Sequence, residues 1–463
     1  MNKSTKEVDG LDMPRSKIDD AEVQQSHVFG DRTDGGPDYR NVGWLGTVAL
    51  MMKTQIGLGI LTIPASFHAL GLIPGIILLC FIAVLTGWAS HVIGTFKHRH
   101  FETYGIDDAA RLLFGRAGFE VFGCIFVIYW IFIAGSAMLG ISIGLNAVSA
   151  HGACTAVFVA VAAAAAFGLG SIRTLGRISW LAWIGLASIL TAVFTVTIAV
   201  GVQDKPTDAP DDQPWKSDFQ LFGSPRFVDA ATALSGFVFA YAGVPAYFSL
   251  FAEMRDPRHY TRSVITSQCA ITATYIVVGT VVYYFCGSYV ATPALGSAGG
   301  LLKKVSYGLA LPGLLVSATL FVHIPAKYLL VRVLRDSKHL TANTMTHWLC
   351  WIGCTLGITI VAYIVASAIP IFGSLTSLIG SLFGCLMSFM FMGFMWFYDN
   401  WSVGKAQPTN KWRLRALWAA AVVLMGAFLM VGGTYGSIVS IMDSYSASGG
   451  ASAWSCADNS NSS

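Results

Sequence analysis

Charged residues are scarce in this sequence. They make up 12% of its 463 residues, and 54% are hydrophobic, whereas a soluble domain carries about 25% charged residues. The net charge is only +4, which is too small to indicate a nucleic-acid-binding surface. The composition therefore predicts an integral membrane protein, with the lipid bilayer as a partner and no nucleic-acid partner.

Motifs for metal binding and for covalent catalysis are also missing. The nine cysteines are scattered, without a CxxC pair or a Cys/His spacing, so neither a metal nor a cofactor is expected. The apolar segments contain no paired carboxylates, histidine cluster or activated nucleophile, which an intramembrane enzyme would need. The chain is therefore predicted not to be an enzyme.

Long apolar segments fill the chain between residues 42 and 443. A membrane-spanning helix needs about 20 mostly apolar residues, and about eleven segments meet this criterion. They lie near 44–67, 71–96, 119–148, 153–171, 178–202, 227–252, 264–287, 309–331, 347–369, 371–398 and 414–441. Residues 1–41 are polar and are expected to form a disordered cytoplasmic tail, and residues 444–463 a short extracellular tail.

Basic residues are distributed unequally between the predicted loops. If the N-terminus is cytoplasmic, most of the lysines and arginines fall in cytoplasmic loops, and the opposite loops contain only Lys205, Lys216, Arg226, Lys303 and Lys304. Cytoplasmic loops of membrane proteins carry the excess of such residues. The distribution therefore predicts a cytoplasmic N-terminus.

The first apolar segment contains an interruption. Gly57 and Gly59 flank Leu58, and Pro64 follows. Glycine costs about 1 kcal/mol and proline about 3 kcal/mol relative to alanine in a helix interior. Backbone groups that such a break frees must be satisfied within the protein or by a ligand. The segment is therefore predicted to be a broken helix with a functional use.

A second interruption begins the second half of the chain. A polar loop, residues 203–226, is followed by an apolar segment that contains Gly243 and Pro245. Five segments precede the loop, so the two interrupted segments have opposite orientations. This arrangement is typical of transporters with an inverted repeat and a midplane binding site. We predict an all-α membrane protein with a five-plus-five inverted repeat, broken helices 1 and 6, and one extra helix.

The two breaks together match a zwitterion. Amide N–H groups after Gly59 would bind a carboxylate, and carbonyl groups near Tyr241 would accept hydrogen bonds from an ammonium group. Because no acidic residue lies close to either break, a neutral amino acid is favoured, although each aromatic residue there also fits ordinary packing. The predicted substrate-binding residues are Gln55, Ile56, Gly57, Leu58, Gly59, Ile60, Tyr129, Phe239, Tyr241, Ala242 and Gly243.

Lys53 has two interpretations. It lies about one turn before the first break and roughly 14 Å from the start of its segment, so its side chain could extend to the cytoplasmic interface. Alternatively, it could be a tethered cation or a proton-carrying group beside the break.

Four segments resemble one known family. Lys53–Pro64, Phe239–Gly243, Glu253–Pro257 and Ile369–Gly380 are similar to segments of the amino acid/auxin permeases. The closest resemblance is to fungal neutral amino acid permeases of the methyltryptophan-resistance type. It extends over nearly the whole membrane domain, from about Asn41 to Ile441.

This resemblance implies an architecture like that of the bacterial sodium-coupled leucine transporter. It places the substrate carboxylate at Gly57–Gly59 and the amine at Tyr241–Gly243. In that architecture a sodium ion lies between spans 1 and 8, where this chain has Lys53, with Ser317 and Thr319 as candidates opposite. A lysine there departs from a sodium-binding pattern and favours a proton as the coupled ion.

The sequence thus predicts a secondary active transporter of a fungal cell that imports neutral L-amino acids, aromatic and aliphatic ones included, by proton symport. The resemblance favours the plasma membrane, with the vacuolar membrane as the alternative. Two other functions stay open: an uncoupled facilitator or channel, and a membrane protein that senses amino acids.

Overall fold

The computed structural model describes residues 40–172, 175–206, 209, 215–335, 337–340, 342–447 and 454–460. Within these residues, ten helical segments are long and apolar enough to cross a membrane, and a shorter apolar helix spans Thr155–Gly170. The all-α class and the approximate number of spans are thus confirmed. The predicted N-terminal tail lies outside the described residues except for residues 40 and 41.

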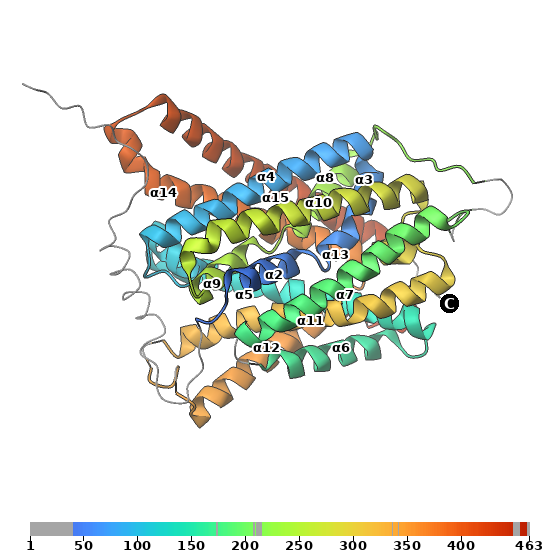
Figure 1. Ribbon diagram of the computed structural model, residues 1–463, viewed down its shortest axis with the longest axis horizontal. Coiled ribbons are helices and arrows are strands. Elements are labelled where there is room, and N and C mark those ends of the chain that lie inside the picture. The colour runs from blue at the N-terminus through green and yellow to red at the C-terminus, as the bar shows by residue number, and fades with distance from the viewer. Residues whose placement is uncertain are drawn as a thin grey trace, which may run out of the picture.

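The first half of the bundle begins with a broken helix and continues with four further helices (Figure 1). Its elements are α2 (Trp44–Gln55), the 3₁₀ turn η1 (Gly59–Thr62), α3 (Ile63–Leu70), α4 (Leu72–Arg99), α5 (Ile106–Ser149), α6 (Thr155–Gly170) and α7 (Leu175–Val202).

The second half repeats this pattern and adds one helix. Its main elements are α8 (Phe227–Ala240), the 3₁₀ turn η2 (Val244–Ala246), α9 (Tyr247–Glu253), α10 (Tyr260–Cys286), α11 (Gly300–Val333), α12 (Met345–Ala368), α13 (Phe372–Leu378), α14 (Phe391–Ala406) and α15 (Asn410–Ala447). Short 3₁₀ turns lie at Pro257–His259, Gly287–Tyr289 and Ala294–Ser297, and π-helical turns at Ile379–Gly384 and Leu386–Met390 join α13 to α14.

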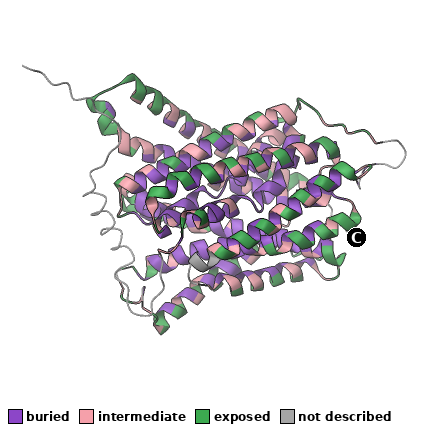
Figure 2. Cartoon of the chain, viewed as in Figure 1, coloured by how far each residue is buried: buried purple, intermediate pink, exposed green. Residues whose placement is uncertain are grey.

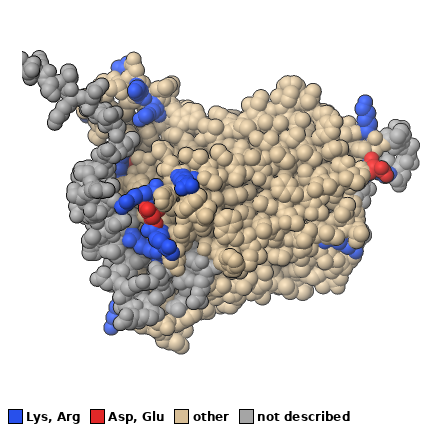
Figure 3. Space-filling model, viewed as in Figure 1, with Lys and Arg blue, Asp and Glu red and all other residues tan. Residues whose placement is uncertain are grey.

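The broken helices lie at the centre of the bundle. In the most apolar stretch of Trp44–Leu70, 89% of the residues are buried, against 22% for Asn410–Ser446. Buried residues accordingly concentrate in the interior in Figure 2. The face shown in Figure 3 carries its charged side chains near the two ends and an uncharged band between them, as a bilayer requires.

Several helices extend beyond their predicted limits. α5 begins at Ile106 instead of residue 119, and the left-handed Gly115 (φ 67°) interrupts it. α11 begins at Gly300 rather than at residue 309, and α15 continues to Ala447, past the predicted end of the membrane domain at residue 443. Helices can continue outside a bilayer, where polar residues are accommodated, so a search for apolar segments underestimates their length.

Candidate functional site

Both predicted interruptions are present, and they touch each other. α2 ends at Gln55 and α8 ends at Ala240. A Cβ atom on Gly59 would lie 2.7 Å from Ala240 Cα, and one on Gly243 would lie 2.3 Å from Thr54 Oγ1. The glycine of each break therefore permits close approach to the end of the opposite half-helix.

The second half-helices begin without side-chain caps. Leu58 precedes η1 and Gly243 precedes η2, and neither position has a side-chain hydrogen bond to the turn that follows. Each turn leads directly into a helix, α3 or α9. Amide N–H groups at such a start carry partial positive charge and suit a carboxylate.

Tyrosine side chains connect the breaks to the surrounding helices. The hydroxyl of Tyr275 in α10 lies 2.9 Å from the Gln55 carbonyl oxygen and 2.8 Å from that of Ala240. Tyr129 in α5 donates a hydrogen bond to the Ala242 carbonyl. The Gln55 amide donates to the Tyr247 hydroxyl at 2.6 Å, which joins α2 to α9.

Lys53 is buried inside the bundle. Its ammonium nitrogen lies 2.6 Å from Ser317 Oγ in α11 and 3.3 Å from the Ile56 carbonyl oxygen, and both side chains are fully buried. The interpretation in which this lysine extends to the interface is therefore wrong. A Cβ atom on Gly57 would lie 2.7 Å from Ser317 Oγ, so the glycine allows α11 to reach the lysine.

Lys53 lacks an acidic partner in the part of the chain that the structure describes. The ion pairs found there involve other residues. An ammonium group buried without a counter-ion is costly in a membrane. The Lys53 ammonium group is therefore held by the Ser317 hydroxyl and the Ile56 carbonyl and not by a carboxylate.

Four of the predicted substrate-binding residues are buried at or beside the breaks. Ile56, Leu58 and Ile60 are buried at the first break, and Leu58 lies against Gly140 of α5. Phe239 is buried too, with its backbone against Gly380.

Two predicted side chains make their hydrogen bonds away from the breaks. The Tyr241 hydroxyl lies 2.9 Å from Thr272 Oγ1 in α10. The Thr319 hydroxyl donates to the Leu315 carbonyl of its own helix, whereas Ser317 faces Lys53.

Sequence reasoning missed a buried ion pair at the cytoplasmic end predicted for this bundle. Glu253 is 1% exposed and lies 2.6 Å from Lys327 of α11. The Glu253 carbonyl also accepts a hydrogen bond from the Val42 amide. The only signal for this pair was an acidic residue that directly follows an apolar segment, which does not identify a partner 74 residues away.

The opposite end contains two cavities with a segment of the C-terminal region between them. One, of about 780 Å³, is lined by Tyr307, Lys303 and Asn459 among others. The other, of about 760 Å³, reaches Thr62 and Ser66 beside the first break and is also lined by Asn459. A ligand that approaches the breaks from this end therefore meets residues 454–460.

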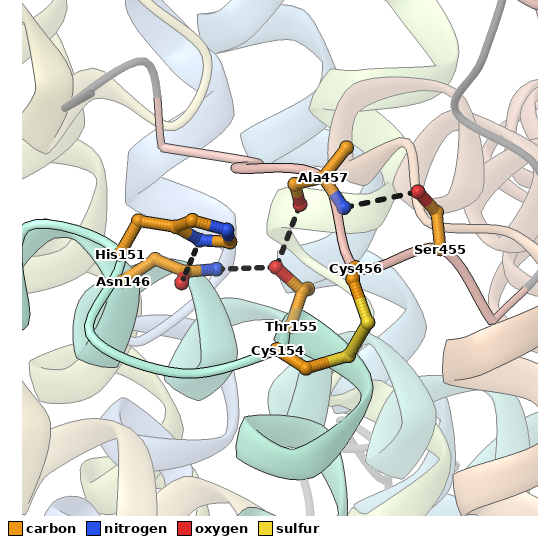
Figure 4. Close-up of a disulfide and its surroundings, with 7 residues drawn as sticks. All are labelled: Asn146, His151, Cys154, Thr155, Ser455, Cys456 and Ala457. Carbon is orange, nitrogen blue, oxygen red and sulfur yellow. Dashed lines mark hydrogen bonds between the residues drawn. A yellow bond between two sulfur atoms is a disulfide. The ribbon is translucent and has the colours of Figure 1, made fainter.

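A disulfide attaches this segment to the bundle. Cys456 is bonded to Cys154, 302 residues earlier, as Figure 4 shows. Thr155 donates a hydrogen bond to the Ala457 carbonyl at 2.7 Å, and the Asn146 amide donates to the Asn459 side chain at 2.7 Å. The segment is thus joined to both α5 and α6.

The fold, with its two broken helices, is similar to that of solved membrane transporters. A solved Na⁺-coupled sialic acid symporter, in a substrate-bound outward-open state, superimposes with a TM-score of 0.55 over 92% of this chain and 96% of its own, at 11% identity. This likeness confirms the predicted leucine-transporter-like architecture.

Sequence comparison identifies the family. The family model described as transmembrane amino acid transporter protein matches residues 40–439. A transmembrane transporter of Gibberella moniliformis is 34% identical over 94% of this chain and 92% of the relative. The N amino acid transport system protein of Neurospora crassa is 33% identical over 92% of this chain and 90% of the relative. The chain belongs to the transmembrane amino acid transporter family. The family and the two relatives named above are transporters and not enzymes.

Proposed function

We propose that this protein is a proton symporter that imports neutral L-amino acids by alternating access. The observation that carries the proposal is the contact between the two glycine-containing breaks. Uncapped amide groups at the start of η1 lie beside the carbonyl ends of α2 and α8. The charge distribution matches a carboxylate and an ammonium group on one small molecule.

The substrate would lie between the two breaks. Its carboxylate would bind at Gly57, Leu58 and Gly59, and its ammonium group would face the end of α8, with Ala242 and Gly243 close by. The residues at the breaks and those that contact them in the described structure are uncharged apart from Lys53. This supports a neutral substrate, since a charged side chain would require a counter-ion there.

Lys53 is the proposed coupling residue, with Ser317 as its partner. Its ammonium group contacts the Ile56 carbonyl, one residue from the carboxylate site. A proton on Lys53 and a substrate at the break would therefore influence each other directly. The movement of one charge through the membrane potential supplies about 2.3 kcal/mol per 100 mV, which is sufficient to accumulate substrate.

Two observations support an extracellular position for the C-terminal end. Basic residues concentrate in the loops at the end of the bundle opposite to the C-terminal end. Cytoplasmic loops of membrane proteins carry the excess of such residues. The Cys154–Cys456 disulfide lies at the end that contains the 203–226 loop, and disulfides form in oxidising compartments. We place the N-terminus in the cytoplasm and the protein in the plasma membrane.

Uptake by proteoliposomes tests the proposal. Purified protein is reconstituted with an imposed proton or sodium gradient, and uptake of a labelled neutral amino acid is competed with a panel of others. Proton-driven accumulation is expected. Conductance or equilibration that is independent of any gradient would instead indicate an uncoupled facilitator or channel.

The coupling role has its own test. Lys53→Met is expected to lose most of its proton-driven accumulation while it remains membrane-inserted, because the proposed proton carrier is gone. The control is Lys405→Met, which removes an exposed lysine at the end of α14. An unchanged pH dependence of uptake in Lys53→Met would refute the coupling role.

A further inference from the structure

Tyr275 occupies the meeting point of the two broken helices. It is fully buried in the middle of α10. Its hydroxyl lies 2.9 Å from the carbonyl oxygen of Gln55 and 2.8 Å from that of Ala240, the last residues of α2 and α8. A single side chain from a third helix therefore contacts both helix ends.

The donors at this point are fewer than the acceptors. A tyrosine hydroxyl has one hydrogen, while each carbonyl oxygen has two lone pairs. Tyr275 can therefore donate fully to only one of the two carbonyls at a time. Both carbonyls also carry the partial negative charge of a helix C-terminus. Three oxygen atoms thus share one hydrogen, an arrangement that favours an additional cationic donor.

Gly59 lies directly against these oxygen atoms. A Cβ atom there would lie 3.0 Å from the Tyr275 hydroxyl and 2.7 Å from Ala240 Cα. The amides proposed to bind the carboxylate follow immediately after it in η1. A ligand that enters between the breaks would bring its carboxylate and its ammonium group within reach of both sites.

We propose that the Tyr275 oxygen is the third acceptor for the substrate ammonium group, together with the Gln55 and Ala240 carbonyls. The three N–H groups of the ammonium group then donate to these three oxygen atoms. The Tyr275 hydroxyl hydrogen still donates to one lone pair of one of the two carbonyl oxygens. Without substrate, the same hydroxyl holds the two helix ends together. This inference rests on the proposed function and adds a recognition residue from α10, outside both breaks.

The test removes one donor from the ligand and one acceptor from the protein. Competition of labelled amino acid uptake gives inhibition constants for L-alanine and N-methyl-L-alanine, and for L-phenylalanine and N-methyl-L-phenylalanine. In the wild type, N-methylation is expected to weaken binding about tenfold, the value of one hydrogen bond to a charged group. In Tyr275→Phe, the parent amino acid should bind about tenfold more weakly, and the ratio between each pair should approach one.

The matched control is Tyr283→Phe, on the same helix. The Tyr283 hydroxyl accepts a hydrogen bond from the Gln220 amide, near the extracellular loop. This variant should keep the wild-type ratio. Tyr275→His retains a polar ring atom and is expected to give an intermediate ratio. If Tyr275→Phe is not monodisperse in detergent, Tyr275→His is used in its place.

The possible failures are distinguishable. If wild-type proteoliposomes take up no neutral amino acid, the proposed function itself is contradicted. If they do, and N-methylation weakens binding equally in the wild type and in Tyr275→Phe, only the role of Tyr275 is overturned, because a purely structural residue would affect both ligands alike. A changed sodium requirement with an unchanged ratio would overturn it in favour of a bound metal cation.

Discussion

Gly59 permits the contact between the two breaks because it has no side chain. Its Cα faces the backbone of Ala240, at a distance that leaves no room for a methyl group. The two breaks can touch only because this side chain is absent. The same contact brings the carbonyl end of α8 next to the first turn of η1.

A Gly59→Ala variant is therefore expected to fold and to lose transport. The added Cβ would lie 2.7 Å from Ala240 Cα, which pushes the breaks apart and obstructs the substrate position. Uptake should fall at least about tenfold, which corresponds to about 1.4 kcal/mol in the transport step. Gly353→Ala, whose Cβ would have no neighbour within 4 Å, serves as the control. Normal uptake by Gly59→Ala would contradict the placement of the site.

Single residues were predictable where their role depends on local backbone chemistry. Gly57, Gly59 and Gly243 could be identified because glycine inside an apolar segment is costly. Tyr275 could not be identified, since it is one tyrosine in an apolar helix. Its partner Gln55 lies 220 residues away, and no local pattern encodes such a contact.

The short helix α9 is connected to α11 by a buried ion pair. Glu253 ends α9, and its carboxylate lies 2.6 Å from the Lys327 ammonium group. The second carboxylate oxygen of Glu253 has no hydrogen-bond partner in the described structure. Glu253 therefore joins the second half of a broken helix to a long helix of the bundle through one carboxylate oxygen.

Removal of either charge alone should destabilise the protein strongly. Lys327→Met leaves the buried Glu253 carboxylate without this ammonium group, and Glu253→Gln removes the carboxylate that Lys327 contacts. Loss of one member of a buried ion pair typically costs about 3–5 kcal/mol. The double variant is expected to recover much of this loss, because neither charge remains. Unfolding in mixed detergent micelles gives the comparison. A double variant less stable than either single variant would show that the pair does not act as a unit.

Whole elements were predictable to the extent that membrane burial determines them. The break in the first helix was expected at Gly57–Gly59, and α2 ends at Gln55. The start of α5 before residue 119 and the π-helical turns between α13 and α14 were not predicted. These features depend on packing against neighbouring helices, which hydropathy does not report.

The disulfide acts on the molecule as a whole. Cys154 precedes α6, and Cys456 lies in the segment between the two cavities of the outer end. The bond closes a loop that contains α6, α7 and the whole second half of the bundle. The sequence contains nine cysteines and does not specify which two of them meet, because the pairing follows from the completed bundle.

Loss of this bond should lower the midpoint of thermal inactivation in detergent. A crosslink over a long loop restricts the unfolded chain, and here it also holds residues 454–460 in place. Cys154→Ser, Cys456→Ser and the double variant should have the same effect, because all three remove one bond. Cys124→Ser, which removes an exposed free cysteine, is the control. Alkylation of Cys456 in unreduced wild-type protein would contradict the crosslink.

The position of this crosslink also orders the biogenesis of the protein. Cys154 is translated before α6, whereas Cys456 follows the last helix, α15. The bond can form only after α6 to α15 have been translated and the two cysteines have come together. Its formation therefore reports that the chain has been synthesised as far as Cys456 and that Cys456 has met Cys154, and a non-reducing gel can follow it during synthesis.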